Sequence, residues 1–242
     1  MNEVLQQLTR RKSVRVFEDR PILPQERQQI LEAAVQAPTA GNQQLYTILN
    51  ITDPKLKDAL VHSCDEQPFI AQGKLVLIFC ADCRKWYEAF RIGGCEPRKP
   101  GVGDLLLSVC DALIAAQNAV VAAESLGIGS CYIGDIMENC ETQRALLNLP
   151  EYVFPAAMLV FGYPTAQQLS RRKPARSPMD TVVHENGYRL PSPEELEKML
   201  RCKCSQPDYR QWLAAFCKRK YNSDFSREMT RSVGQYLKQF EE

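Results

Sequence analysis

The sequence has few of the residues on which hydrolytic side-chain catalysis depends. Among its 242 residues there are only two histidines, His62 and His184, and neither has neighbours that suggest a catalytic triad. It also lacks a lysine-containing phosphate loop, an HExxH pair and a GxSxG turn. Together these absences disfavour a histidine-dependent hydrolase.

An excess of positive charge is missing as well. Thirty Lys and Arg face 29 Asp and Glu, so the formal net charge is +1, and neither an aromatic-rich RNA motif nor a zinc-finger spacing occurs. We therefore expect no nucleic-acid partner. Apolar residues make up 45% and charged residues 24% of the chain, which is typical of a globular protein with a sizeable core.

The amino-terminal stretch carries neither the apolar core nor the small-residue cleavage site of a secretory signal. The longest apolar run, 105–126, is long enough to span a bilayer, but it contains Asp111 and Glu124. Lipid penalises each charged residue near its centre by roughly 2–3 kcal/mol. We expect a buried helix at the centre of the molecule or in a subunit interface, no membrane partner, and a cytoplasmic location.

The ten cysteines are scattered, and in a reducing cytoplasm most are expected to be thiols that pack as small apolar side chains. Cys80 and Cys83 have CxxC spacing, and Cys202, Cys204 and Cys217 could be arranged as a soft-metal site. Neither set comes with a second ligand pair, so we expect no metal. A redox disulfide between Cys80 and Cys83 is disfavoured because Cys80 ends an apparent buried strand.

Apolar periodicity and turn residues predict alternating helices and strands, of the α/β or α+β class. The uniformly apolar run 75–80 is typical of a strand buried on both faces. A capping box at 192–195 starts a helix, and we expect a domain over 1–195 followed by a helical extension over 196–242. Strands are predicted at 46–51, 75–80, 130–133 and 153–162, and helices at 1–10, 24–37, 54–64, 105–126, 141–147, 209–221 and 226–240.

Four segments could carry chemistry. The first, 10–17, places several cations and a hydroxyl at a helix-to-strand junction, and arginine suits phosphate because its planar fork can engage two oxygens together. A second basic group, 171–176, lies far along the chain, and two polar turns, 37–44 and 127–135, contain glycines that permit close backbone approach. Taken singly, the basic groups also fit a solvated surface and the turns fit ordinary loops.

Taken in order, these segments resemble the FMN-dependent nitroreductase family, and more closely its NAD(P)H-dependent flavin reductases and oxygen-insensitive nitroreductases. The matching pieces, in the order and spacing of the family, are 11–17 (RKSVRVF), 37–44 (APTAGNQQ), 66–70 (EQPFI), 126–129 (LGIG), 132–134 (YIG) and the basic loop ending at Arg176.

The resemblance implies an intertwined homodimer of α+β subunits, each with a mixed sheet flanked by helices and a long buried helix at the dimer core. It implies one FMN in each of two interface sites. The implied FMN-binding residues are Arg11, Lys12, Ser13 and Arg15 near the phosphate, ribityl chain or ring edge; Pro38, Thr39 and Asn42 from the other subunit; Gln67 at the isoalloxazine edge; Ile133 and Gly134 near flavin N5 and O4; and Lys173 and Arg176 over the phosphate.

The activity implied by the resemblance is ping-pong hydride transfer from NAD(P)H through FMN to nitroaromatic, quinone or flavin acceptors. Because donor and acceptor stack in turn over the flavin, no catalytic side chain is required. The backbone N–H of Ile133 is the candidate donor to flavin N5. NADH and NADPH both remain possible as donors.

Two alternatives remain open. Another reaction on the same flavin, such as reductive dehalogenation, enone reduction or flavin fragmentation, would need lid residues, for which the loop 86–103 with Trp86, Tyr87 and Phe90 is the expected place. A non-enzymatic binding module would instead use the tail 201–242, whose nine basic and five acidic residues give +4, to contact an anionic partner. In the enzyme, the extension is expected to pack on the partner subunit.

Overall fold

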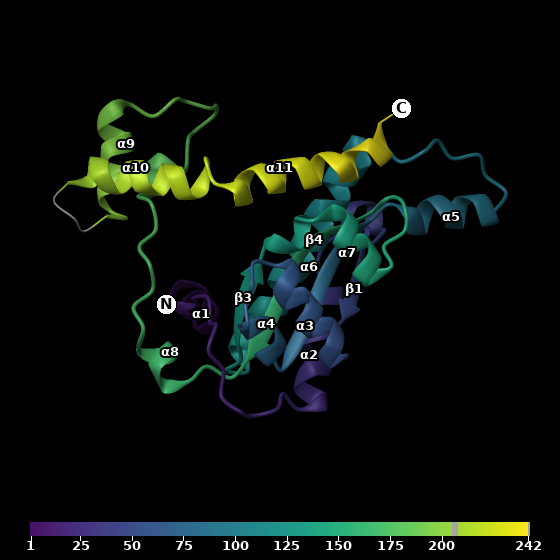
Figure 1. Cartoon of the computed structure of the whole chain (residues 1–242), viewed down its shortest axis with the longest axis horizontal. Helices are drawn as coiled ribbons and strands as arrows, with labels where there is room; N and C mark the ends of the chain where they lie inside the picture. The colour runs from purple at the N-terminus through teal and green to yellow at the C-terminus, as the bar shows by residue number, and fades with distance from the viewer. Residues whose placement is uncertain (205–207, 242) are drawn as a thin grey trace. The chain divides into compact units, whose positions relative to one another are not determined.

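The computed structural model describes residues 1–204 and 208–241, and its centre is a four-stranded sheet in the order β1-β2-β4-β3 (Figure 1). Each neighbouring pair of these described strands is antiparallel. We expected a mixed sheet; parallel pairing is limited to an isolated bridge between Ser13 and Ser130, because the amino-terminal segment meets β3 at one residue pair. The strands are β1 (Tyr46–Asn50), β2 (Leu75–Asp82), β3 (Gly129–Ile133) and β4 (Val153–Gly162).

Both faces of this sheet are buried, which explains why β2 is uniformly apolar. Its residues alternate between two cores, with Leu77 and Phe79 in one and Ile78 and Cys80 in the other. The predicted strand with two buried faces is therefore confirmed. The first core is closed by α2 (Pro24–Val35) and α6 (Val102–Ser125), and the second by α3 (Pro54–Ser63) and α4 (Phe69–Gln72).

The long apolar helix is confirmed as α6, which packs an alanine-rich side on the sheet. Ala112, Ala116 and Ala119 are fully buried, and their small side chains let the helix approach the strands closely. The opposite side exposes large apolar side chains. By length and composition α6 could cross a membrane, yet its buried Asp111 is hydrogen-bonded within the domain, as described below. This fits the expected core or interface helix.

Residues 11–17, which we call the strap, cross the ends of β3 and β4. The backbone N–H of Val14 donates to a β3 carbonyl at 2.9 Å. Two glycines permit this approach, since a Cβ at Gly129 would lie 2.6 Å from Val14 and one at Gly162 would lie 2.6 Å from Phe17. The course of the strap therefore depends on glycine at these two positions of the sheet.

The other predicted helices agree with the observed ranges to within a few residues, the short helices α4 and α8 were not predicted, and one segment needs a correction. The segment 86–103 was expected to be a loop, but its first part belongs to helix α5 (Arg84–Ile92). The aromatic residues Trp86, Tyr87 and Phe90 recur at helical spacing and line one cavity, which favours the helix over a loop. The remaining elements of the first 171 residues are α1 (Glu3–Arg10), α7 (Cys140–Leu147), α8 (Ala166–Ser170) and the 3₁₀ turns Ala40–Asn42 and Asp135–Met137.

The chain forms two compact units. Their division does not fall at the expected boundary between residues 195 and 196. One unit contains Met1–Arg171 and the residues from Glu228 on, and the other contains Arg172–Arg227. The last helix returns to the first unit because Ser232 and Tyr236 are buried there, and Ser232 Oγ donates to a backbone carbonyl at 2.7 Å. The second unit holds Met179–Thr181, α9 (Pro193–Arg201) and α10 (Tyr209–Lys220), and α11 (Asp224–Leu237) precedes the turn Lys238–Phe240.

Candidate functional site

Three polar residues of the strap gather around one thiol of β3. Burial raises the pKa of Cys131, and the charges of Arg15 and Arg11 together with a hydrogen bond from Ser13 act in the opposite direction. All three residues therefore act on the same thiol. Val14, which lies between them in the sequence, is buried.

Arg11 has two buried hydrogen-bond donors without a use in the fold. Its guanidinium carbon lies 6.0 Å from the centroid of the Tyr132 ring. Its Nε and Nη2 atoms are buried, and neither finds a hydrogen-bond partner within the described part of the chain. A buried donor left unpaired costs about 1–3 kcal/mol, and more when it is charged. These two donors therefore indicate a position for an anionic or strongly accepting ligand.

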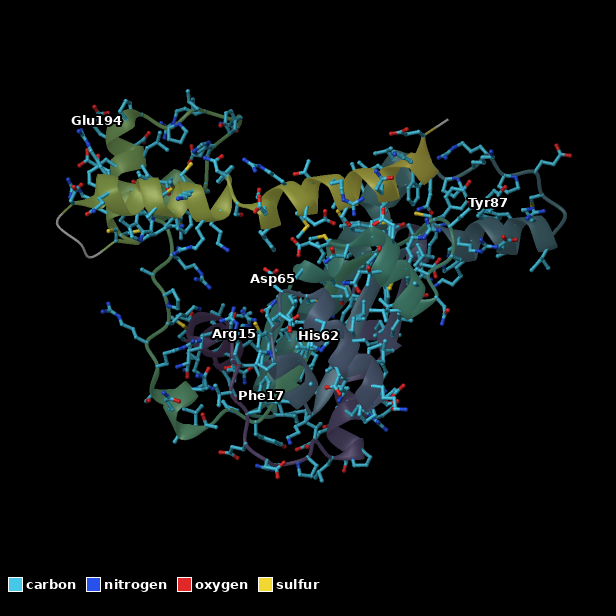
Figure 2. All side chains as sticks on the ribbon, viewed as in Figure 1. Arg15, Phe17, His62, Asp65, Tyr87 and Glu194 are labelled. Carbon is cyan, nitrogen blue, oxygen red and sulfur yellow. The ribbon has the colours of Figure 1, made fainter. Side chains whose placement is uncertain are left out.

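Arg15 links the strap to the segment before α4. Arg15, which Figure 2 labels, is exposed. Its guanidinium carbon lies 5.8 Å from the centroid of the Phe69 ring. Two residues before Phe69, the half-buried Gln67 donates through Nε2 to the carbonyl of Cys64 at 2.9 Å. This bond fixes the direction of the Gln67 amide, as binding to the edge of a planar ring requires.

The turn after β3 lies next to the same segment. Ile133 ends β3 and is buried, whereas Gly134 is exposed and begins the turn Asp135–Met137. Carboxylate oxygens of Asp65 and Asp135 lie within 4.8 Å of each other, so the backbone around Gln67 and Gly134 is adjacent. At the edge of β3 the chain thus places Arg11 at Tyr132, Arg15 at Phe69, and the turn after Ile133 next to the segment that holds Gln67.

Lys12, also predicted at the cofactor, is occupied elsewhere. Its ammonium donates to the backbone carbonyl of Leu169 at 2.7 Å and to that of Arg171. Arg171 in turn donates to the carbonyl of Ser13. These bonds fasten the strap to the last turn of α8 and to the residue that follows it. Sequence reasoning did not single out Arg171 as a positioning residue, and its place in the basic group 171–176 was the available signal.

The loop 38–45 is fastened to the middle of α6 by Asp111. This carboxylate is 3% exposed and accepts hydrogen bonds from the hydroxyl of Thr39, from Ala40 N at 3.1 Å and from Leu45 N at 3.1 Å. Asp111 is therefore a positioning residue for the predicted site loop. An acid in the middle of an apolar run was the sequence signal for it.

Within a single chain, the loop 38–45 and the strap lie at different positions along α6. Arg11 and Val120 line the same small cavity, whereas Thr39 bonds to Asp111. Nine residues separate Asp111 from Val120, which is about 14 Å at the rise of an α-helix. The predicted residues Pro38 and Asn42 are exposed, so a second copy of the chain could use them.

Lys173 and Arg176 belong to the second unit. Arg176 is exposed and donates through Nη1 to the carbonyl of Pro174 at 3.4 Å. The carbonyl of Arg176 accepts a hydrogen bond from the thiol of Cys202, the sulfur lying 3.5 Å away. Their place over a cofactor phosphate stays a prediction.

A cavity of about 290 Å³ opens between α5 and α6. Trp86, Tyr87 and Phe90 form one wall, and Trp86 Nε1 donates to the carbonyl of Gln43 at 2.7 Å. The aromatic residues expected on a lid loop thus belong to a helix that is tied to the loop 38–45. They shape a cavity beside the predicted site loop.

The cysteines, all ten of which are described, are thiols in the structure. Burial raises the pKa of Cys80 to about 12 and that of Cys83 to about 11. Both thiols are therefore protonated at neutral pH, which is the state of packing residues rather than of reactive ones.

Comparison with protein families decides the relationship. The model of the "Nitroreductase family" matches residues 8–163, which include the strap, the loop 38–45 and the turn at 133–134. The chain belongs to the nitroreductase family. The resemblance drawn from the sequence is confirmed.

Curated relatives of this family member include flavin and nitro reductases. The chain is 31% identical to an FMN reductase (NAD(P)H) of Bacillus subtilis, with 98% of this chain and 91% of that protein covered. It is 36% identical to an oxygen-insensitive NADPH nitroreductase of Salmonella typhimurium, with 78% of this chain and 75% of that protein covered.

Solved structures of nitroreductase-type enzymes share the fold. The NADPH:FMN oxidoreductase of Vibrio harveyi, complexed with NAD⁺, matches with a TM-score of 0.77 at 25% identity over 99% of this chain and 98% of that chain. The NfrA1 nitroreductase of Bacillus subtilis matches with a TM-score of 0.78 at 27% identity, covering 94% and 98%. Membership in this family favours an enzyme over a non-enzymatic binding module.

Proposed function

We propose that this chain is an NAD(P)H-dependent FMN oxidoreductase of nitroreductase type, located in the cytoplasm and active as a homodimer. When bound, FMN accepts a hydride from NAD(P)H and passes the reducing equivalents to a nitroaromatic, quinone or flavin acceptor. The family and the names of its relatives support this reaction.

The observation that carries the proposal is the state of Arg11. Its buried Nε and Nη2 atoms are without partners among the described residues, and a guanidinium fork suits a phosphate or another acceptor-rich group. Ser13 adds a hydroxyl and Arg15 a second cation around the same β3 position. This set of donors fits an anionic flavin nucleotide.

The other residues at the β3 edge would orient the flavin ring. Gln67, held by the carbonyl of Cys64, would bond the ring edge, and the backbone N–H of Ile133 with Gly134 would lie near flavin N5 and O4. Positive charge from the strap would stabilise negative charge on the reduced ring. Lys173 and Arg176 would close over the phosphate, whereas Lys12 would hold the strap in place.

A second copy completes the site in this proposal. Pro38, Thr39 and Asn42 would reach the flavin from the partner subunit, which agrees with their distance from the strap along α6. Large apolar side chains exposed on one domain mark an interface. Such side chains on α1 and α6 are Val4, Leu5, Leu8, Leu106, Leu107, Leu113 and Ile114. The part of the extension before Glu228 would pack on the partner as well.

The absorbance spectrum of the purified protein tests the proposal. We expect a yellow protein with flavin bands, one FMN per chain, and bleaching of those bands by NADH or NADPH without oxygen. A colourless protein that fails to take up added FMN would contradict it. A panel of acceptors with each donor in turn then shows which acceptor and which nucleotide are preferred.

A second candidate is another reaction on the same flavin, such as reductive dehalogenation or enone reduction. The aromatic cavity between α5 and α6, beside the loop 38–45, favours it as a place for a ring-shaped acceptor. Faster turnover of a halogenated phenol or an enone than of nitroaromatics and quinones in the acceptor panel would select this alternative.

A further inference from the structure

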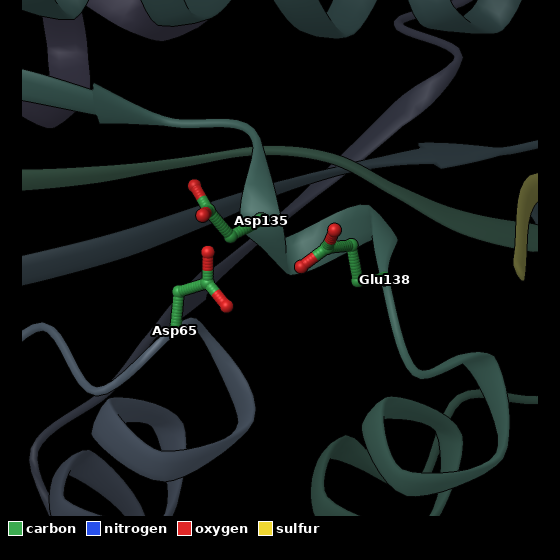
Figure 3. Close-up of side chains that lie close together, drawn as sticks. All are labelled: Asp65, Asp135 and Glu138. Atoms are coloured by element: carbon green, nitrogen blue, oxygen red, sulfur yellow. The ribbon is translucent and has the colours of Figure 1, made fainter. Parts of the chain in front are cut away.

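Carboxylates from two separate turns converge next to the end of β3 (Figure 3). Asp65 follows α3, Asp135 begins the turn after β3, and Glu138 directly follows that turn. One carboxylate oxygen of each residue lies within 4.8 Å of those of the other two. Like charges at this distance repel each other strongly in a partly buried position. An arrangement of this kind calls for a compensating positive charge.

Glu138 supplies an independent sign that a ligand is needed. The residue is 3% exposed, and its Oε1 atom is buried with no hydrogen-bond partner in the described chain. The charges that act on it, from Asp65, Asp135 and Glu228, are all negative. The fold thus buries an acceptor of Glu138 beside two further acids and leaves it unpaired within the described chain.

The chemistry and the spacing of the oxygens select the ligand. Carboxylate oxygens are the donors that hard divalent cations prefer. Ca²⁺ takes six to eight oxygens in a flexible geometry, with carboxylates bound through one or both oxygens, whereas Mg²⁺ needs near-ideal octahedral geometry and retains several waters. Three carboxylates on two separate turns, with oxygens within 4.8 Å of one another, therefore suit Ca²⁺ better. We propose that Asp65, Asp135 and Glu138 form a binding site for one Ca²⁺ ion.

Such an ion would clamp two segments of the proposed flavin site to each other. Asp65 is two residues before Gln67, and Asp135 directly follows Gly134. Both Asp65 and Glu66 have a positive φ, at 60° and 52°, so this connection adopts a backbone conformation that a cross-link would help to hold. The ion touches neither Gln67 nor Gly134, and its binding does not depend on flavin chemistry.

Calorimetric titration of the full-length protein with CaCl₂ tests the site. The protein, with whatever flavin it carries, is treated with EDTA, dialysed and titrated at pH 8, and its thermal unfolding is recorded with and without Ca²⁺. We expect one Ca²⁺ per chain, a higher unfolding midpoint with Ca²⁺, and weaker binding of Mg²⁺. Absence of Ca²⁺ binding, or tighter binding of Mg²⁺, would overturn the proposal.

Two variants locate the ion. Glu138→Gln should lower the Ca²⁺ affinity by at least about tenfold, the scale on which metal sites respond to altered ligation. Asp65→Asn, at an exposed position, should do the same and covers the case in which Glu138→Gln does not fold. Glu66→Gln is the control, because this neighbouring carboxylate pairs with His62 instead and should leave Ca²⁺ binding unchanged. Wild-type affinity in Asp65→Asn would refute the site even if the flavin assignments are correct.

Discussion

At the scale of single residues, the strap shows that the type of a residue does not reveal whether its side chain is already paired within the fold. Arginines and a serine in this order suffice to predict anion binding. The fold adds that Arg15, Ser13 and Arg11 all act on the pKa of Cys131 and that two Arg11 donors are buried without partners among the described residues. Lys12, of the same charge as its neighbours in the sequence, is instead taken up by the carbonyl of Leu169.

Replacing Arg11 tests whether its donors serve the cofactor or the fold. Arg11→Met should weaken FMN binding by about 1.5–3 kcal/mol, the scale of hydrogen bonds to a charged group. The stability of the flavin-free protein should stay the same or rise, because an unpaired buried charge is removed. Fluorescence titration with FMN and urea unfolding measure the two effects. Arg10→Gln, an exposed change at the end of α1, is the control; equal FMN affinities in the two variants would argue against this role.

Arg176 can be tested in the same way from the second unit. Arg176→Ala should weaken FMN retention by about 1–3 kcal/mol if this exposed cation closes over the phosphate. The measurement is the FMN dissociation constant by equilibrium dialysis. An unchanged constant would remove Arg176 from the site and leave the strap as the source of phosphate contacts.

At the scale of elements, regular apolar patterns predicted well and isolated features did not. The strands 75–80 and 153–162 and the apolar helix appear as β2, β4 and α6 with end points shifted by a few residues. Helix α5 was missed because aromatic residues at 86, 87 and 90 were interpreted as a lid. The acids at 65, 135 and 138 were not connected, because no local pattern brings residues from two separate turns together.

The fastening of the loop 38–45 to α6 should depend on Asp111. Asp111→Asn keeps the shape but replaces an acceptor by an NH₂ group that faces other donors, so we expect a loss of about 2–4 kcal/mol in the free energy of unfolding. FMN retention should fall too, because the loop is proposed to reach the partner's flavin. Urea unfolding and flavin content measure this. Cys110→Ser, next to it on the exposed side of α6, is the control, and equal stability of the two variants would show that Asp111 is dispensable.

The docking of α11 should depend on pH through Glu141. Hydrogen bonds from Arg231, at 2.9 and 3.0 Å, lower the pKa of Glu141 from its usual 4.5 to about 2. A carboxyl whose pKa is lower in the folded state stabilises it above pH 4.5 and loses this effect as the pH falls towards 2. The stability advantage of wild type over Arg231→Met in urea should therefore be constant from pH 7 to 5 and shrink below pH 4.5. Arg227→Met removes an exposed ion pair within α11, and the stability advantage of wild type over this variant should be smaller at every pH. A stability advantage of wild type over Arg231→Met that does not change with pH would contradict this account.

At the scale of the whole molecule, α6 joins the core to the proposed interface. Its alanines face the sheet, and Leu106, Leu107 and Leu113, with up to 61% of their surface exposed, lie on the other side. Sedimentation equilibrium should therefore give twice the chain mass of 27.5 kDa.

Leu107→Glu with Ile114→Glu should produce monomers that retain their secondary structure and lose FMN, since a charge in an apolar interface opposes association. Leu23→Glu, an exposed change at the residue before α2, should leave the dimer intact. A wild-type protein that sediments as a monomer with bound FMN would refute the shared site.

The sequence alone determined the family, the positions of most helices and strands, and the residue types at the β3 edge, because these depend on local periodicity and on short ordered motifs. Tertiary structure decided which of these residues are left unpaired, that Asp111 anchors a loop far from it in the chain, and that three separate acids share one position. Pairing and burial are properties of contacts between distant segments, and no local pattern of residues encodes those contacts.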